Sequence, residues 1–154
     1  MKPAKTFPAI GFFILLSTSL HAACTGATAA GTFGFTTIGT LILPTGPAPV
    51  AAVGVVSFDR DGSTTGSQDR SVGGVFAHET IAGTLTVNRD CTISLLARVY
   101  DDSGNLVRTS TIPGVLVNNG KQIRAMFETV VLPNGLNLPS VLTIEADRVR
   151  GHTE

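Results

Sequence analysis

Apolar and polar residues alternate along most of the chain, and short breaks rich in glycine, proline, asparagine and aspartate separate the alternating runs. Alternation with a period of two is typical of a β-strand that buries one face. The clearest unit covers residues 81–100, where two alternating runs flank the polar break Asn88-Arg89-Asp90. This unit predicts a β-hairpin. No stretch keeps apolar residues at a 3.6-residue period over more than two turns, so the pattern predicts no long helix.

The same pattern predicts about eight strands. They cover residues 31–37 with an extension to 43, then 50–60, 63–76, 79–88, 92–100, 106–117, 121–132 and 140–150. Residues 44–49 hold three prolines and are expected to form a loop. Gly73-Gly74 indicates a bulge in the third strand, and Asn118-Asn119-Gly120 is the strongest hairpin turn in the chain. Consecutive antiparallel strands of this number predict an all-β, up-and-down barrel of about eight strands, with a β-sandwich as the alternative.

The first 23 residues have the pattern of a secretory signal peptide. Lys2 and Lys5 precede an apolar run over residues 10–16, and Ala22 and Ala23 supply small residues for cleavage. The apolar run is shorter than the roughly 20 residues that a transmembrane helix needs. We therefore expect an exported protein with no integral membrane segment after signal removal, a barrel domain over residues 24–150 and a frayed tail over 151–154.

The chain has two cysteines, Cys24 and Cys91, and both remain after signal removal. In the oxidising space outside the cytoplasm, periplasmic or extracellular, they are expected to form a disulfide. The alternative is a lipoprotein anchored through Cys24. A lipobox usually has leucine three residues before its cysteine, whereas this chain has His21 at that place.

Charge and motifs narrow the classes of function. The export segment carries Lys2 and Lys5, so nine of the 11 basic residues remain beside 11 acidic ones, a net charge of −2. Nucleic-acid binding requires a basic surface, which this composition does not provide. No Cys-x-x-Cys motif, glycine-rich phosphate loop or Gly-x-Ser-x-Gly motif occurs. We expect neither a metal site nor a cofactor.

Charged residues inside the expected strands are the candidates for chemistry. Arg98, Arg124 and Glu128 either face solvent or point inward and form a polar spot in an apolar lumen, where they would fix a ligand or act as an acid/base pair. Alternation alone does not choose between the faces, because several strands carry apolar residues on both sides. The full set of candidate ligand-lining residues is Phe33, Phe35, Phe58, Phe76, Arg98, Tyr100, Arg124, Phe127 and Glu128.

Three segments carry a resemblance to a known group of proteins. They are Gly-Thr-Phe-Gly-Phe at 31–35, the run 51–59 that leads into Asp61-Gly62, and the run 83–92 that ends in Asp-Cys-Thr. Together they resemble small exported bacterial proteins of unassigned function, whose pattern is similar to barrels of the allene oxide cyclase type, which are lipocalin-like in shape. The resemblance implies an eight-stranded barrel with an apolar cavity. It carries no catalytic residues onto this chain.

Three functions follow as hypotheses. The first is an exported barrel that binds a small hydrophobic ligand in its lumen. The second is a cyclase or isomerase of the allene oxide cyclase type that acts on a lipid-like or polyketide-like substrate. The third is a structural or interaction module with a filled core. Ligand identity and oligomeric state stay open at this point.

Overall fold

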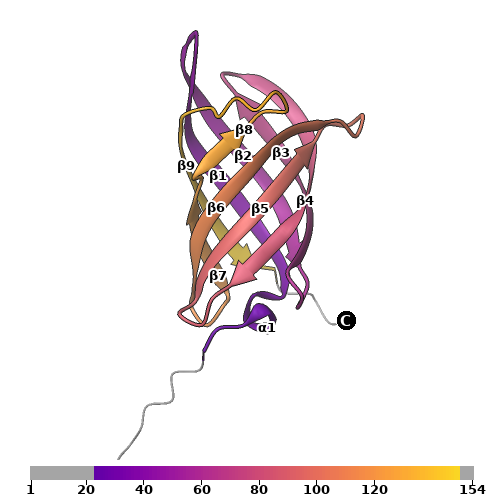
Figure 1. Ribbon diagram of the computed structural model, residues 1–154, viewed down its shortest axis with the longest axis vertical. Coiled ribbons are helices and arrows are strands. Elements are labelled where there is room, and N and C mark those ends of the chain that lie inside the picture. Colours follow the sequence, from indigo (N-terminus) through magenta and orange to yellow (C-terminus); the bar gives the residue numbers. More distant parts are fainter. Residues whose placement is uncertain (1–22, 150–154) are drawn as a thin grey trace, which may run out of the picture.

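The chain folds into a closed antiparallel β-barrel with a short helix at one end (Figure 1). The computed structural model describes residues 23–149. The elements are α1 (Gly26–Ala29), β1 (Gly31–Leu43), β2 (Gly46–Phe58), β3 (Ser63–Val72), β4 (Val75–Val87), β5 (Thr92–Tyr100), β6 (Leu106–Val117), β7 (Gln122–Met126), β8 (Thr129–Val131) and β9 (Ser140–Arg148). The expected signal segment, apart from Ala23, and the expected tail lie outside the described residues.

Eight strands form the ring, and the predicted up-and-down barrel is confirmed. Neighbouring strands pair in chain order from β1 to β7, and β9 pairs with both β7 and β1, which closes the sheet. The one described strand outside the ring is β8, which pairs with β6 beyond the end of β7. Because the sheet is closed, β1 to β6 have no free edge along most of their length.

The alternation of the sequence fixes the two faces of the barrel. In β5, for example, Ile93, Ala97 and Val99 are buried in the lumen, while Ser94 and Arg98 are exposed on the outer face. The same alternation holds along β1, from Phe33 onward. The lumen is therefore the hydrophobic core of the domain.

Of the loop expected over residues 44–49, Pro44 and Thr45 form a turn, and the rest is strand because β2 already begins at Gly46. Pro47 and Pro49 pair with β1 on one side. On the other side β2 pairs with β3 only from Val50 onward. These prolines lie in an edge segment that extends beyond the neighbouring strand, where a missing N–H group costs little.

The pair Gly73-Gly74 forms the turn between β3 and β4 and not a bulge inside one strand. Both residues have positive φ, 57° and 89°, as a two-residue hairpin turn requires. The predicted turn at Asn118-Asn119-Gly120 is confirmed, and all three residues have positive φ.

The expected seventh strand is broken between Met126 and Thr129. The pairing with β6 shifts by one residue across the break, from Gly114 opposite Ala125 to Thr111 opposite Thr129. On the other side, the pairing of β7 with β9 ends at Met126. Beyond this point β8 pairs with the loop that follows it, because the N–H of Leu138 donates to the carbonyl of Val130 and Asn137 Oδ1 accepts from the N–H of Val130.

The predicted disulfide between Cys24 and Cys91 is confirmed, and it joins two positions that are 67 residues apart in the sequence. Cys91 has a positive φ of 69° in the β4–β5 turn, and the N–H of Cys24 donates to the carbonyl of Arg89 in the same turn. The disulfide therefore ties the segment that leads into α1 to the hairpin at residues 81–100. Such a bond is consistent with an oxidising, exported location.

Removing the disulfide should destabilise the domain without opening the barrel ring. The double variant Cys24→Ser/Cys91→Ser is expected to lose about 4 kcal/mol of the free energy of unfolding, because the unfolded chain regains the entropy of a 67-residue loop. Urea denaturation followed by circular dichroism measures the change. The wild-type protein in reducing agent should lose the same amount, and a loss below about 1 kcal/mol in both would show that the bond does not constrain the unfolded chain.

Candidate functional site

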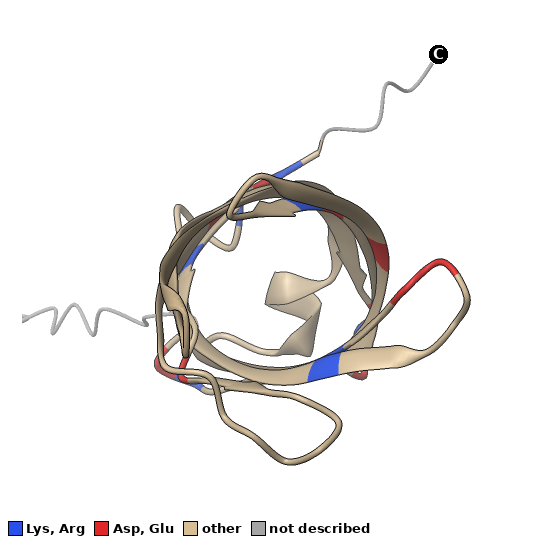
Figure 2. Cartoon of the chain, turned by 90° about the horizontal axis from the view of Figure 1, so that it is seen from above, with Lys and Arg blue, Asp and Glu red and all other residues tan. Residues whose placement is uncertain are grey.

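One end of the lumen is closed by α1 (Figures 1 and 2). Seen along the barrel from above, the helix lies inside the ring of strands at the far end. Arg148 of β9 fixes it there, because its guanidinium donates to the carbonyls of Ala30, Thr28 and Gly120. The same guanidinium lies over the ring of Phe33, 4.7 Å from its centroid. We call this end the plugged end and the opposite end the mouth.

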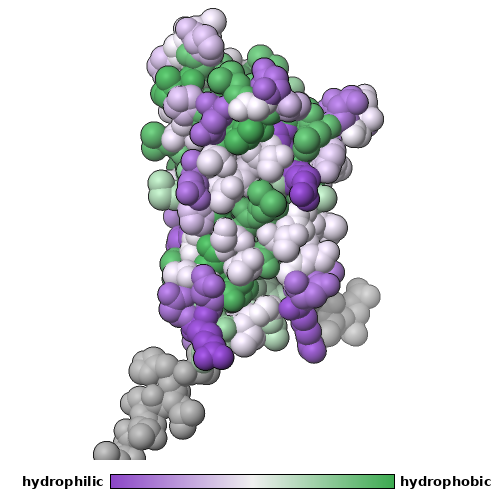
Figure 3. Space-filling model, in the orientation of Figure 1, coloured by the Kyte–Doolittle hydropathy of each residue, from purple (hydrophilic) through white to green (hydrophobic). Residues whose placement is uncertain are grey.

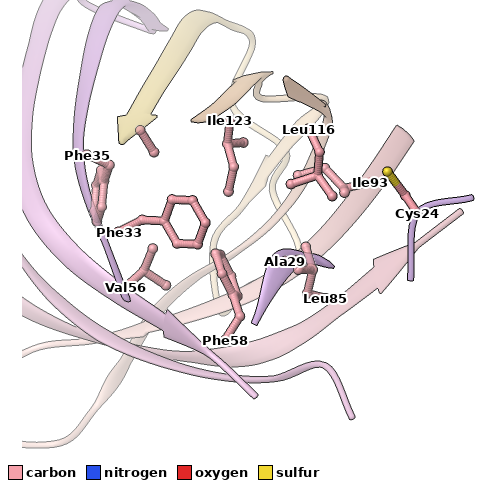
Figure 4. Packing of buried hydrophobic residues seen from close by; sticks show 11 residues of the cluster. Cys24, Ala29, Phe33, Phe35, Val56, Phe58, Leu85, Ile93, Leu116 and Ile123 are labelled. Carbon is pink, nitrogen blue, oxygen red and sulfur yellow. The ribbon is translucent and has the colours of Figure 1, made fainter. Parts of the chain in front are cut away.

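A dense apolar cluster fills the lumen next to α1 (Figure 4). Phe33 is fully buried there and packs against Phe58, with ring centroids 5.7 Å apart. Ala29 of α1, also fully buried, covers the cluster from the plugged end. This part of the lumen is packed with side chains in the way that small barrels require.

Two cavities lie further along the lumen. The one nearer the plug has a volume of about 70 Å³, and Phe35, Phe58 and Phe127 are among its lining residues. The one nearer the mouth has a volume of about 190 Å³, and Leu41 and Val72 place it at the ends of β1 and β3 that lie away from α1. The cavities share four lining residues, Thr37, Gln68, Arg108 and Phe127.

A layer of polar side chains lies where the two cavities meet, and its centre is the carboxylate of Glu79 on β4. Glu79 is 1% exposed and accepts four hydrogen bonds. Arg108 of β6 donates two of them, each 2.7 Å long, in a bidentate pair. Arg70 of β3 donates one from Nε at 2.5 Å, and Gln68 donates one from Nε2 at 2.7 Å. We call these four residues the lumen charge cluster.

The carboxylate of Glu79 is held in its ionised form. Burial by itself raises the pKa of this carboxyl group, but the hydrogen bonds and charge of Arg108, with those of Arg70 and Gln68, outweigh it and lower the pKa to about 2. The cluster holds two guanidinium groups and one carboxylate, so its net charge is +1. Arg70 and Arg108 line the mouth cavity, whereas Glu79 lies behind them, outside the lining of either cavity.

Ser110 adds an unpaired polar group to this layer. Its side chain is buried, and its Oγ has no hydrogen-bond partner within the described residues. It lies two positions after Arg108 on the inward face of β6 and lines the smaller cavity. An unpaired buried hydroxyl is uncommon in a folded protein, and this one keeps its donor and acceptor capacity among the described residues.

The aromatic candidates from the sequence are divided between three places. Phe35, Phe58 and Phe127 line the cavities, and Phe33 is packed beneath α1. Phe76 is 68% exposed in the β3–β4 hairpin at the mouth. Hydrophobic residues also reach the surface at this end of the face that Figure 3 shows. Phe76 lies three positions before the inward Glu79 of β4, so alternation places it on the outer face.

The charged candidates from the sequence are not brought together in the lumen. Arg98 and Glu128 are exposed, and Arg124 is on the outer face, 3.0 Å from Glu145 of β9. Tyr100 is half-buried and lines neither cavity. The inward positions of these strands belong to their neighbours Val99, Ala125 and Phe127, so the strand register excludes the polar spot that the sequence suggested.

The lumen charge cluster was missed by sequence reasoning, although the sequence contains its signal. Glu79 shares one face of β4 with Ile81 and Leu85. Arg108 shares one face of β6 with Ile112. A charged residue in register with a buried apolar face is the signal. His78, the neighbour of Glu79, points outward as alternation requires, and its Nδ1 lies 2.7 Å from Asp69 Oδ1. Within residues 23–149, no three side chains of the types that bind metal ions lie together.

Replacing the buried carboxylate should cost stability and change its dependence on pH. Glu79→Gln is expected to lower the free energy of unfolding at pH 7 by about 3 kcal/mol, because it leaves two largely buried guanidinium groups without a counter-charge. Glu145→Gln is the matched control, since it removes an exposed ion pair worth less than about 1 kcal/mol. Thermal and urea denaturation measure both variants.

The pH profile follows from the lowered pKa of Glu79. Between pH 4.5, the ordinary value for this group, and about 2, the unfolded chain takes up a proton that the folded protein does not. The stabilisation is complete above pH 4.5 and is lost as the pH falls through this window, by about 3 kcal/mol. Glu79→Gln should show a shallower acid slope than wild type, and equal slopes in the two proteins would contradict this assignment.

The comparisons with known proteins add no assignment. No family model matches the chain, and no curated protein matches its sequence. Among residues 23–149, no helix is both long enough and apolar enough to span a membrane.

Proposed function

We propose that this protein is an exported barrel that binds a small hydrophobic molecule in its lumen, entering through the mouth. The observation that supports this most directly is the mouth cavity of about 190 Å³. Ten of its 14 lining residues are apolar, and they come from β1, β2, β3, β6, β9 and the β7–β9 region. A dry apolar cavity of about 150 Å³ is large enough for one benzene-sized molecule. The cavity here suits a single ring or a short alkyl chain.

The two ends of the barrel support this direction of entry. The plugged end is closed by α1, the disulfide and Arg148. The mouth cavity is bordered by strand ends and by the loop that follows β8, through Leu132 and Leu138. Apolar residues at a cavity entrance let an apolar ligand pass without losing contact with apolar surface.

Export follows from the predicted signal segment and the oxidised cysteines. A periplasmic or extracellular binding protein meets its ligand in water, where an apolar molecule gains free energy by entering an apolar cavity. Removal from water stabilises a bound alkyl chain by about 0.8 kcal/mol for each buried CH₂ group. An eight-carbon chain can therefore bind measurably even in a small cavity.

The lumen gives less support to the cyclase or isomerase hypothesis. Among residues 23–149, Glu79 is the one acidic residue that is buried. A general base works best with a pKa near the pH of the reaction, whereas the pKa of Glu79 is about 2. Its four hydrogen bonds also occupy both oxygens. Binding therefore fits the site better than proton transfer.

A neutral short-chain alcohol tests the proposal. 1-Octanol is expected to bind and to shift the amide signals of residues around the mouth cavity, such as Val130 and Leu142, in NMR spectra of the ¹⁵N-labelled protein. Leu142→Trp should abolish these shifts, because the larger side chain fills the cavity. Val141→Trp, on the exposed outer face of the same strand, is the matched control. Absence of saturable shifts in the wild-type protein would leave the barrel as a module with a filled core.

A further inference from the structure

We propose that the ligand is an amphiphile with a carboxylate head group, held by Arg70 and Arg108, with its apolar part directed toward the mouth. This inference rests on the proposed function and names the class of ligand. It is carried by the geometry of the lumen charge cluster and its position between the two cavities.

The two charged residues of the cluster that line the mouth cavity, Arg70 and Arg108, carry hydrogen-bond donors and no acceptor. Glu79 uses both carboxylate oxygens on protein donors and lines neither cavity. Arginine has five N–H groups. Within the described residues, Arg70 donates one of them to protein and Arg108 donates two, so both keep N–H groups for a ligand. Both side chains line the mouth cavity.

The charge of the cluster matches a monoanion. A charge that is largely removed from water is costly unless an opposite charge compensates it. The side chains of Arg70 and Arg108 are 25% and 15% exposed, and one of the two guanidinium groups has no carboxylate of its own. Glu79 is the buried acidic residue of the part of the chain that the structure describes. One ligand carboxylate would make the layer neutral. A phosphate monoester, which carries close to two charges at pH 7, would leave it negative.

The shape of the head group is also matched. A guanidinium presents a planar fork of N–H groups, which pairs with a carboxylate in two parallel hydrogen bonds. Arg108 already pairs with Glu79 in this way. Arg70 binds Glu79 through Nε alone, so its two terminal nitrogens are free for a second carboxylate among the residues described. The unpaired hydroxyl of Ser110 supplies a further polar group in the same layer.

The test compares sodium octanoate with 1-octanol, which share chain length and differ in charge. Isothermal titration calorimetry at pH 7 on the oxidised protein is expected to give at least about tenfold tighter binding of octanoate, since charge-assisted hydrogen bonds are the stronger kind. Equal affinities would overturn the carboxylate assignment and leave the proposed function intact. Binding of neither molecule would overturn both.

Variants assign the effect to residues. Arg70→Gln leaves the bidentate pair of Glu79 and Arg108 in place and makes the cluster neutral, so the ratio of octanoate to octanol affinity should fall close to one. Arg98→Gln removes an exposed arginine of the outer face and should keep the wild-type ratio. If both variants keep the wild-type ratio, the anion is held elsewhere and the assignment to Arg70 is wrong.

A measurement on the wild-type protein keeps the proposal testable if Arg70→Gln does not fold. Octanoate labelled with ¹³C at its carboxyl group reports its ionisation through its NMR shift. The bound carboxyl group is expected to have a pKa below that of free octanoate, because the guanidinium groups favour the anion. A bound pKa above the free value would show a carboxyl group buried without a cationic partner, and would overturn the proposal.

Discussion

Closure of the sheet is the constraint on which the rest of the structure depends. Pairing of β9 with β1 gives every inward side chain the same interior, so each strand must present a face that suits that interior. A shift of one residue in any strand would exchange its two faces. The register of each strand therefore determines whether a charged residue points into the lumen or toward the solvent. It places Arg124 outside beside Glu145, and it places Glu79 inside between Arg70 and Arg108.

The buried charges are difficult to explain by stability alone. An ion pair in an interior often contributes no more than apolar residues of the same volume, because the desolvation of both charges offsets their attraction. Here the arrangement also carries an unbalanced positive charge and an unpaired hydroxyl at Ser110. A core selected only for packing would place apolar residues at these positions. The cluster lies where the two cavities meet, and its unbalanced charge supports the proposed binding site.

Sequence patterns predicted the fold well, because turns and alternation are local signals. The hairpin at residues 81–100, the Asn-Asn-Gly turn and the Cys24–Cys91 bond were confirmed. The errors came from long-range pairing. Pro47 and Pro49 are tolerated in β2 because β3 ends before reaching them, and the seventh strand is broken where its pairing with β6 shifts by one residue. The residues of the site could be predicted only where the sequence shows which face of a strand points inward. A strand with apolar residues on both faces does not show this. Glu79 and Arg108 share a face with apolar residues, so the sequence indicated that they point inward, but it did not show the strand pairing that brings them to Arg70.

The arginines at the two ends of the lumen show where binding capacity remains. Arg148 at the plugged end donates to three backbone carbonyls and covers the ring of Phe33, so its donors are directed to the protein itself. Among residues 23–149 it has no carboxylate partner. Arg70 donates to protein through Nε alone among the described residues and borders a cavity. Arginine therefore has two different roles along this lumen. The N–H groups of Arg148 bind backbone carbonyls and hold α1 in place. The terminal N–H groups of Arg70 face a mostly apolar cavity, where they are available to the proposed anionic ligand.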